Sequence, residues 1–208
     1  MRVVHLTDSR ILIVDDQEEN LKALSAVLTV AGYSNLNCLR DSRQFLAVFR
    51  EFRPDLVLLD LHMPHVDGLA AIDQMATVTA EDEYMPILVM TGDGSSEAKE
   101  KALSHGAHDF LHKPLNRSEV RLRVRNLLET RHLHLQLKGQ NEFLAQQAQR
   151  YRERSELQTS LLDQVHDAVL TLDEGFRVLY MNAAAERLFG WTAREALGQQ
   201  YRSHRGRT

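Results

Sequence analysis

The sequence is poor in several features that mark particular classes of protein. It holds one cysteine, Cys38, which excludes an intramolecular disulfide and is typical of a reducing cytoplasm. No apolar run is long enough to span a bilayer, and the first residues lack the apolar core of a signal peptide. We therefore expect a cytoplasmic protein that has no membrane segment.

A strong charge of one sign is also missing. The formal net charge is −4, and basic residues gather only at 117–125 and 202–207. We interpret these clusters as a solvated helix face and a frayed tail, so we expect no nucleic-acid partner. The histidines predict no metal site, because His132 and His134 are two residues apart and point to different faces of a helix.

Proline is absent after Pro114, and the sequence up to that point has the most regular pattern. Short apolar runs alternate there with segments of helical spacing. This predicts a five-stranded parallel sheet covered by helices on both faces, the doubly wound α/β class. The expected strands are 10–15, 35–39, 55–61, 86–91 and 108–111, and the expected helices are 17–31, 41–52, 67–79, 94–105 and one from 116 onward.

Four of the apolar runs lead to reactive residues, which are Asp15 with Asp16, Asp60, Thr91 and Lys113. In an open α/β sheet, ligands bind beyond the carboxyl ends of the strands, so residues far apart in the sequence can converge there. Three carboxylates, one hydroxyl and one ammonium are the groups that a phosphoryl-accepting site needs.

The chemistry assigns a role to each group. The carboxylates are predicted to hold Mg²⁺, a hard cation that prefers oxygen ligands. Asp60 is the predicted nucleophile, because carboxylates are covalent phosphoryl acceptors. The metal, Lys113 and Thr91 would neutralise the charge on the three phosphoryl oxygens. No base is required, because an aspartate is ionised at neutral pH.

Each position also has a simpler interpretation. An aspartate at the end of a strand often caps the next helix, Thr91 is a β-branched residue that suits a strand, and a Lys-Pro pair is usually a turn with a solvated charge. Phe110 is expected to lie in the core, whatever else it does. These interpretations fit the residues singly, but they do not explain why all of them occur together.

The motifs resemble those of the receiver domains of two-component response regulators. They are DD after the first strand, D-L-H-M-P-x-x-D-G around the third, T-G at the end of the fourth and K-P after the fifth. The resemblance covers about residues 9 to 130. It implies a flavodoxin-like fold, a cis Lys113–Pro114 bond, and a sensor histidine kinase or a phosphotransfer protein as the phosphoryl donor.

The resemblance also implies roles for individual residues. In the family, the switch hydroxyl moves toward the phosphoryl group and an aromatic side chain swings inward behind it. The implied phosphorylation site is Asp60, the implied metal ligands are Asp15, Asp16, Asp60 and the backbone carbonyl of His62, and the implied switch pair is Thr91 and Phe110.

From about residue 116 to 164 the composition predicts a long signalling helix. Apolar residues recur near the spacing of a coiled-coil seam, which favours pairing with a second copy in a homodimer. The seam is imperfect, since Gly139 is expected to interrupt the helix and polar residues occupy several seam positions. A solvated single helix is the alternative. The predicted seam is Leu133, Leu137, Leu144, Tyr151, Leu161 and Val165, with Gln140, Gln147 and Arg154 at its polar positions.

Residues 160 to 200 resemble the start of a PAS domain. Two short strands are expected across an Asp-Glu-Gly turn, followed by a helix that Asn182 opens and that ends near Gly190. A complete domain of that family needs three more strands and further helices, so we expect a partial module with no assignable ligand pocket. The last residues, YRSHRGRT, are expected to be unstructured.

The expected organisation is a receiver domain at 1–130, a helical linker at 131–164 and a truncated PAS-like segment at 165–208. The predicted function is that of a response regulator that is not an enzyme beyond its own phosphorylation and dephosphorylation, with any output enzyme outside this chain. The layout resembles regulators that continue into cyclic-dinucleotide enzymes or histidine kinases.

Two other functions remain open. A metal-dependent phosphohydrolase also uses an aspartyl phosphate, but its haloacid-dehalogenase version needs a second aspartate two residues after the nucleophile, where this sequence has His62. The chain is alternatively a phosphorylation-independent dimerisation module. The complete set of acidic, Thr and Lys residues argues against a receiver domain that has lost its phosphoryl-accepting site.

Overall fold

The computed structural model describes residues 5–80, 83–92 and 96–201. The chain packs as two units, Met1–Gly139 and Gln140–Thr208. No helix in the described part is long and apolar enough to cross a membrane. Of the tail that was expected to be unstructured, residues 202–208 lie outside the described residues. The division into 1–130, 131–164 and 165–208 stays a prediction.

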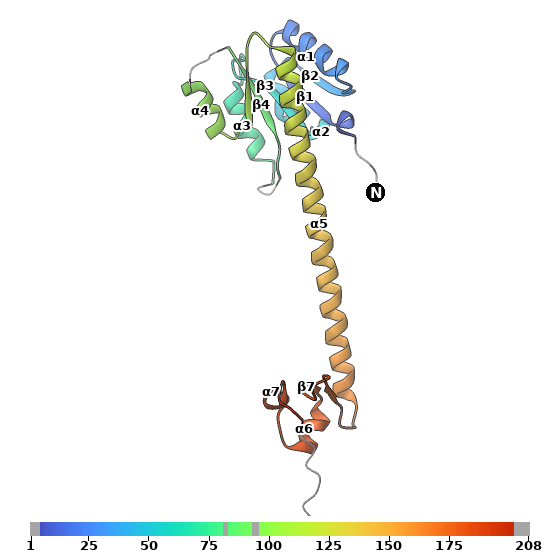
Figure 1. Cartoon of the computed structure of the whole chain (residues 1–208). Helices are drawn as coiled ribbons and strands as arrows, with labels where there is room; N and C mark the ends of the chain where they lie inside the picture. Colours follow the sequence, from blue (N-terminus) through green and yellow to red (C-terminus); the bar gives the residue numbers. More distant parts are fainter. Residues whose placement is uncertain (1–4, 81–82, 93–95, 202–208) are drawn as a thin grey trace, which may run out of the picture. The chain divides into compact units, whose positions relative to one another are not determined.

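The first unit contains a five-stranded sheet with helices on both faces (Figure 1). The strand order is β2-β1-β3-β4-β5 and every neighbouring pair is parallel, so the predicted doubly wound α/β fold is confirmed. The strands are β1 (Arg10–Val14), β2 (Asn35–Leu39), β3 (Leu56–Asp60), β4 (Ile87–Thr91) and β5 (Asp109–His112). The helices are α1 (Glu18–Val30), α2 (Phe45–Phe52), α3 (Gly68–Ala76), α4 (Ser96–Ser104) and α5 (Arg117–Gln164), with 3-10 turns at Leu6–Asp8 and Ser42–Gln44.

The sheet is buried on both of its faces. Ile11 and Ile13 of β1 pack with residues of α1 and α5, whereas Leu12 and Val14 pack with residues of α2 and α3. Successive side chains of a strand point to opposite faces, so an unbroken apolar run fills both cores. These buried strands fix the positions of the residues that come directly after them.

The order of the strands reverses between β1 and β3. The chain runs from β1 outward to β2 and returns to β3 on the other side of β1. Val14 pairs with Leu59, so Asp15 and Asp60 follow side by side on neighbouring strands. Such a reversal is where ligands bind in open α/β folds.

Helix α5 is continuous from Arg117 to Gln164. The expectation that Gly139 interrupts it is wrong, because one glycine costs a helix only about 1 kcal/mol relative to alanine and good helix formers surround it. Val165, which was expected in the seam, lies beyond the last residue of the helix. The seam residues that do lie on the helix have exposed side chains, namely Leu133, Leu137, Leu144, Tyr151 and Leu161.

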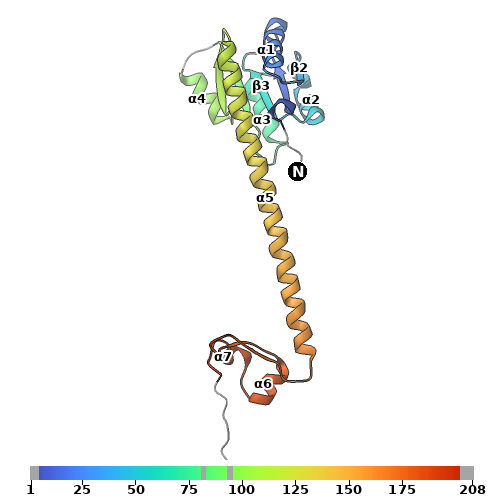
Figure 2. The ribbon, with the colours of Figure 1, turned by 45° about the vertical axis from the view of Figure 1, so that its right-hand side comes forward.

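The second unit contains a small antiparallel sheet and two short helices (Figure 2). The predicted turn is confirmed: Asp173 accepts hydrogen bonds from the backbone N–H groups of Gly175 and Arg177. Asn182 caps the next helix as expected, and Gly190 ends it with a positive φ of 75°. The elements are β6 (Leu170–Leu172), β7 (Val178–Met181), α6 (Ala183–Phe189) and α7 (Ala193–Ala196).

Candidate functional site

Three aspartates meet at the carboxyl ends of β1 and β3. Asp15 and Asp16 follow β1 directly, and Asp60 is the last residue of β3. Each offers a carboxylate oxygen, and these oxygens lie within 4.8 Å of one another. Asp15 and Asp60 are almost completely buried, while Asp16 is half-buried. Residues from two separate strands therefore form one acidic cluster, as the strand pattern predicted.

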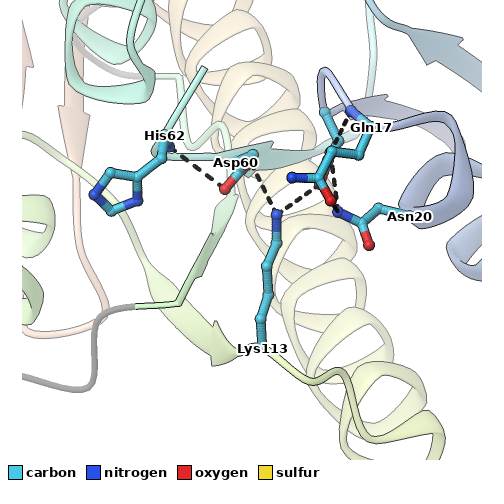
Figure 3. A network of polar contacts seen from close by, with 6 residues as sticks. Gln17, Asn20, Asp60, His62 and Lys113 are labelled. Atoms are coloured by element: carbon cyan, nitrogen blue, oxygen red, sulfur yellow. Dashed lines mark hydrogen bonds and ion pairs between the residues drawn. The ribbon is translucent and has the colours of Figure 1, made fainter. Parts of the chain in front are cut away.

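Lys113 follows β5 directly, and its side chain extends to this acidic cluster (Figure 3). Its Nζ donates to Oδ2 of Asp60 at 2.8 Å and to Oδ2 of Asp15 at 2.9 Å. Its backbone N–H donates to the carbonyl of Thr91 at 2.9 Å, which ties the loop after β5 to the end of β4. The Lys113–Pro114 bond is cis, as the resemblance implied. The ammonium is thus fixed between two carboxylates.

The electrostatics of the cluster follow from burial and from this shared ammonium. Burial raises the pKa of Asp60, and the nearby charge of Asp15 raises it too, although the hydrogen bond from Lys113 lowers it. Burial pulls the pKa of Lys113 down, but the hydrogen bonds to Asp60 and Asp15 and the negative charges of these two residues together outweigh burial, so the net shift is upward. The ammonium therefore stays charged, and negative charge remains in excess.

Asp15 is held by residues at the start of α1 that the sequence pattern did not single out. The side-chain amide of Asn20 donates to Oδ1 and Oδ2 of Asp15 at 3.1 and 3.0 Å, and the backbone N–H of Gln17 donates to Oδ1 at 2.8 Å (Figure 3). With Lys113 on Oδ2, both oxygens of Asp15 are satisfied. The sequence feature that could have indicated the role of Asn20 is its amide side chain in the first turn of the helix after the aspartate pair.

The loop after Asp60 is held close to the end of β3. The backbone N–H of His62 lies 3.4 Å from Oδ1 of Asp60, and the imidazole of His62 is exposed. A Cβ added at Gly68 would meet the backbone carbonyl of Asp60 at 2.5 Å and Cα of Leu61 at 2.7 Å. Glycine is therefore required at 68 by the close approach of α3 to β3.

Thr91 and Phe110 lie on neighbouring strands. Thr91 is buried at the end of β4, and Phe110 of β5 pairs with Val89, two residues earlier. The expectation that Phe110 is a core residue is wrong, because its ring is only half-buried. Nζ of Lys99 lies 4.5 Å from the ring centroid and Cζ of Arg123 lies 5.4 Å from it, so cations of α4 and α5 cover the ring. The role of the two residues as a switch stays a prediction.

The donor set fits a hard divalent cation. Oδ1 of Asp16 is buried, yet it accepts no hydrogen bond from the residues that the structure describes. A buried acceptor without a partner is costly and rare in folded proteins. Asp15 already has partners on both oxygens, so Asp16 offers the open acceptor. Three carboxylates against one ammonium provide the oxygen ligands and the charge that Mg²⁺ prefers.

Comparison with known families agrees with this geometry. Residues 11–125 match the family described as the response regulator receiver domain, which is more than half of the 208 residues. The chain belongs to the response-regulator receiver family. The receiver domain therefore carries the acidic cluster and Lys113. A second match, to the PAS fold, covers residues 156–204, in agreement with the resemblance seen in the sequence.

Curated relatives carry several different names. The chain is 34% identical over 133 residues to regulatory protein AtoC of Escherichia coli, covering 61% of this chain and 28% of AtoC. It is 39% identical over 119 residues to response regulator MprA of Mycolicibacterium vanbaalenii, covering 57% of this chain and 50% of MprA. A Vibrio cholerae protein named "Probable cyclic di-GMP phosphodiesterase" is 32% identical over 171 residues, covering 82% of this chain and 36% of that protein. The chain thus spans half or less of the length of these relatives.

Solved structures match the receiver domain in the same way. NtrX of Brucella abortus superposes with a TM-score of 0.58 and 28% identity, covering 64% of this chain and 29% of that chain. The chemotaxis protein CheY4 of Vibrio cholerae superposes with a TM-score of 0.51 and 28% identity, covering 58% of this chain and 98% of that chain. Two-component signalling is therefore the context of this chain.

Proposed function

We propose that this receiver domain accepts a phosphoryl group on Asp60 from a phosphohistidine of a sensor histidine kinase or of a phosphotransfer protein. The observation that carries the proposal is the Lys113 ammonium, which lies 2.8 Å from Oδ2 of Asp60 within a buried cluster of three carboxylates. Asp15, Asp16, Asp60 and the carbonyl of His62 would hold Mg²⁺. When bound, the cation supplies positive charge where negative charge accumulates during phosphoryl transfer.

The proposed step forms a bond between Asp60 and phosphorus. A carboxylate oxygen of Asp60 attacks the phosphorus atom, the bond from phosphorus to the donor imidazole nitrogen breaks, and its electron pair stays on that nitrogen. Lys113 then turns from the carboxylate to a phosphoryl oxygen, and the hydroxyl of Thr91 follows to another. The hydrogen bonds from Asn20 and Gln17 support this step, because they keep Asp15 satisfied when Lys113 leaves it.

Transmission would start at Thr91 and Phe110. Movement of the Thr91 hydroxyl toward the phosphoryl group opens space beside β5, into which the ring of Phe110 swings. In doing so, the ring gives up its contacts with Lys99 and Arg123. A phosphoryl group shifts the equilibrium only through contacts that differ between the two states, and these are the contacts that we propose to differ.

We further propose a homodimer through α5. The seam side chains of Leu137, Leu144 and Tyr151 are 57%, 62% and 76% exposed, which is a high cost for a row of apolar residues on an isolated helix. A second copy of the helix would cover them. A solvated single helix stays the alternative, because polar residues interrupt the seam.

The output is proposed to lie outside this chain, in a cytoplasmic protein, and the only chemistry of this chain is the gain and loss of its own phosphoryl group. The Vibrio cholerae relative, whose match extends past the receiver domain, carries a name with a cyclic-dinucleotide activity. The phosphohydrolase alternative is disfavoured, because His62 replaces its second aspartate and has an exposed side chain.

The test is phosphoryl labelling of the full chain with a small phosphodonor and Mg²⁺. The wild type should gain one acid-labile phosphoryl group, Asp60→Asn should gain none, and a chelator should abolish labelling of the wild type. Asp67→Asn is the matched control, because asparagine caps α3 as well as aspartate does. Undiminished labelling of Asp60→Asn would move the acceptor elsewhere and overturn the proposal.

A further inference from the structure

Asn182 makes more hydrogen bonds than its place at the start of α6 requires. The residue is completely buried at the end of β7. Its Oδ1 accepts from the backbone N–H of Ala185 at 2.9 Å, which is the usual contact of an N-cap, and from the backbone N–H of Val169 at 2.9 Å. An aspartate at this position could accept both of these hydrogen bonds.

The other end of the same side chain faces the end of α5. Nδ2 of Asn182 lies within hydrogen-bond distance of the backbone carbonyls of Asp167, Leu162 and Val165, at 2.9, 3.1 and 3.3 Å, so its two hydrogens are shared among three acceptors. Leu162 is one of the last four residues of α5, whose carbonyls have no partner within the helix. The three carbonyls thus lie at and just beyond the C-terminal end of α5, and the side-chain amide of Asn182 binds all three.

This arrangement requires an amide. A serine or threonine hydroxyl is too short to serve both sides, and an ionised aspartate has oxygens only, which repel carbonyls. A residue selected only as a cap would need an acceptor and no donor. The donors of Asn182 therefore serve a second purpose, which is to fasten the end of α5 to the corner between β7 and α6.

We propose that Asn182 is the joint that couples the signalling helix to the PAS-like module. Through it, a displacement of the last turn of α5 moves β7 and α6 with it, whereas the loop between helix and sheet would otherwise absorb the displacement. The idea that this displacement originates at Asp60 rests on the proposed function. The joint itself does not, because all of its contacts lie within the second unit.

The experiment measures backbone hydrogen exchange of the full chain in the wild type, Asn182→Asp and Asn182→Ser. Both variants keep a side-chain oxygen for the cap and lose the contacts to the three carbonyls. Exchange at 161–165 should become about fivefold to tenfold faster in Asn182→Ser, the effect of losing about one net hydrogen bond. It should become faster still in Asn182→Asp, because the buried carboxylate would face the three carbonyls. Exchange at 183–189, within α6, should stay near the wild-type rate.

A matched control distinguishes the donors from the cap. Asn116 precedes α5 and accepts through Oδ1 from the backbone N–H groups of Ser118 and Glu119. Asn116→Asp makes the same chemical change at a cap and should leave exchange at 161–165 unaltered. Wild-type exchange at 161–165 in both Asn182 variants would overturn the joint. Faster exchange at 183–189 in both variants would also overturn it, because Asn182 would then be a general requirement for folding of the module.

The last arm adds the phosphodonor and Mg²⁺. Exchange at 183–189 should respond in the wild type and should not respond in Asn182→Asp, although Asp60 is labelled in both. An equal response in the two proteins would overturn the coupling role. A wild type that is not labelled at all would instead refute the proposed function. The joint would then be decided by the exchange rates of the Asn182 variants and of Asn116→Asp.

Discussion

The receiver domain and the second unit are built on different principles. The receiver domain buries both faces of its central strands, and its aspartates follow the buried apolar runs 11–14 and 56–59. The second unit has one small core, formed by Val178, Met181, Ala185 and Ala196, and leaves large apolar side chains exposed, among them Phe176, Leu188 and Trp191. A two-stranded sheet is only marginally stable in water unless other elements pack against it.

The two units also hold their parts of α5 differently. Val120, Val124 and Leu128 pack the start of α5 into a receiver core, and Arg131 adds hydrogen bonds to Glu83 and to the carbonyl of Tyr84. In the second unit, the hydrogen bonds of Asn182 hold the end of the helix. In this chain, the unit with the large core carries a buried charged site, whereas the unit with the small core depends on single polar residues.

The largest expected effect comes from comparing two glycines of the first unit, Gly68 beside the sheet and Gly139 on the exposed part of α5. Gly68→Ala should destabilise the receiver domain by about 3 kcal/mol, because the new Cβ collides with backbone atoms of Asp60 and Leu61 and the core cannot give way. Gly139→Ala meets nothing within 4 Å and should stabilise α5 by about 1 kcal/mol. Urea unfolding followed by circular dichroism measures both. If the two changes alter the free energy of unfolding equally, the close approach of α3 to β3 does not require glycine at position 68.

A second test separates the seam of α5 from the receiver core. Leu137→Asp combined with Leu144→Asp should weaken the proposed dimer at least about tenfold, because like charges would face each other in the seam. The urea midpoint of the receiver domain should not change, since its core lies upstream. Sedimentation velocity over a range of protein concentrations measures the assembly.

The control for the seam test places the same charges on the side of α5 that faces away from the seam. Gln146→Asp combined with Gln149→Asp should leave assembly unchanged, since both side chains are exposed. A wild type that is monomeric at the highest concentration would contradict the dimer and favour the solvated single helix.

The smallest expected effect concerns the buried carboxylate of Asp60 and the pH dependence of stability. Burial raises the pKa of Asp60 above its value in the unfolded chain, so the folded protein holds this proton more tightly. Stability is therefore lost as pH rises from the unfolded pKa, about 3.9, through the folded pKa, and the loss is complete above it. Asp60→Asn should unfold at higher urea than the wild type at pH 7 without Mg²⁺, and this advantage should vanish below about pH 4. Asp67→Asn should show no such gain at pH 7.

Local patterns predicted the receiver fold and the core of its site. Asp15, Asp60 and Lys113 follow apolar runs, and in a parallel sheet the ends of such runs meet at one edge. The partners of these residues could not be predicted in the same way. Asn20 was missed because its role depends on how the first turn of α1 is directed toward Asp15, which no local spacing encodes.

The wrong expectations have related physical causes. Phe110 lies on β5, an edge strand, where cations from α4 and α5 cover an aromatic ring that a central strand would have buried. Gly139 was expected to interrupt a helix, but one unfavourable residue does not overcome many favourable neighbours. Asn182 was predicted as a cap, and its donor contacts were not foreseen, because they join it to a segment 20 residues earlier.

Hydrogen exchange of the full chain, with and without a phosphodonor and Mg²⁺, tests most directly whether phosphorylation of Asp60 reaches the second unit. The proteins to compare are the wild type, Asp60→Asn and Thr91→Ala. We expect exchange to change at 97–112 and at 178–189 in the wild type, and not to change in Asp60→Asn. Thr91→Ala should be labelled on Asp60 but should show no change in either segment. A wild-type response in Thr91→Ala would remove Thr91 from the switch. An unchanged second unit in a fully labelled wild type would contradict the claim that a phosphoryl group on Asp60 acts through α5.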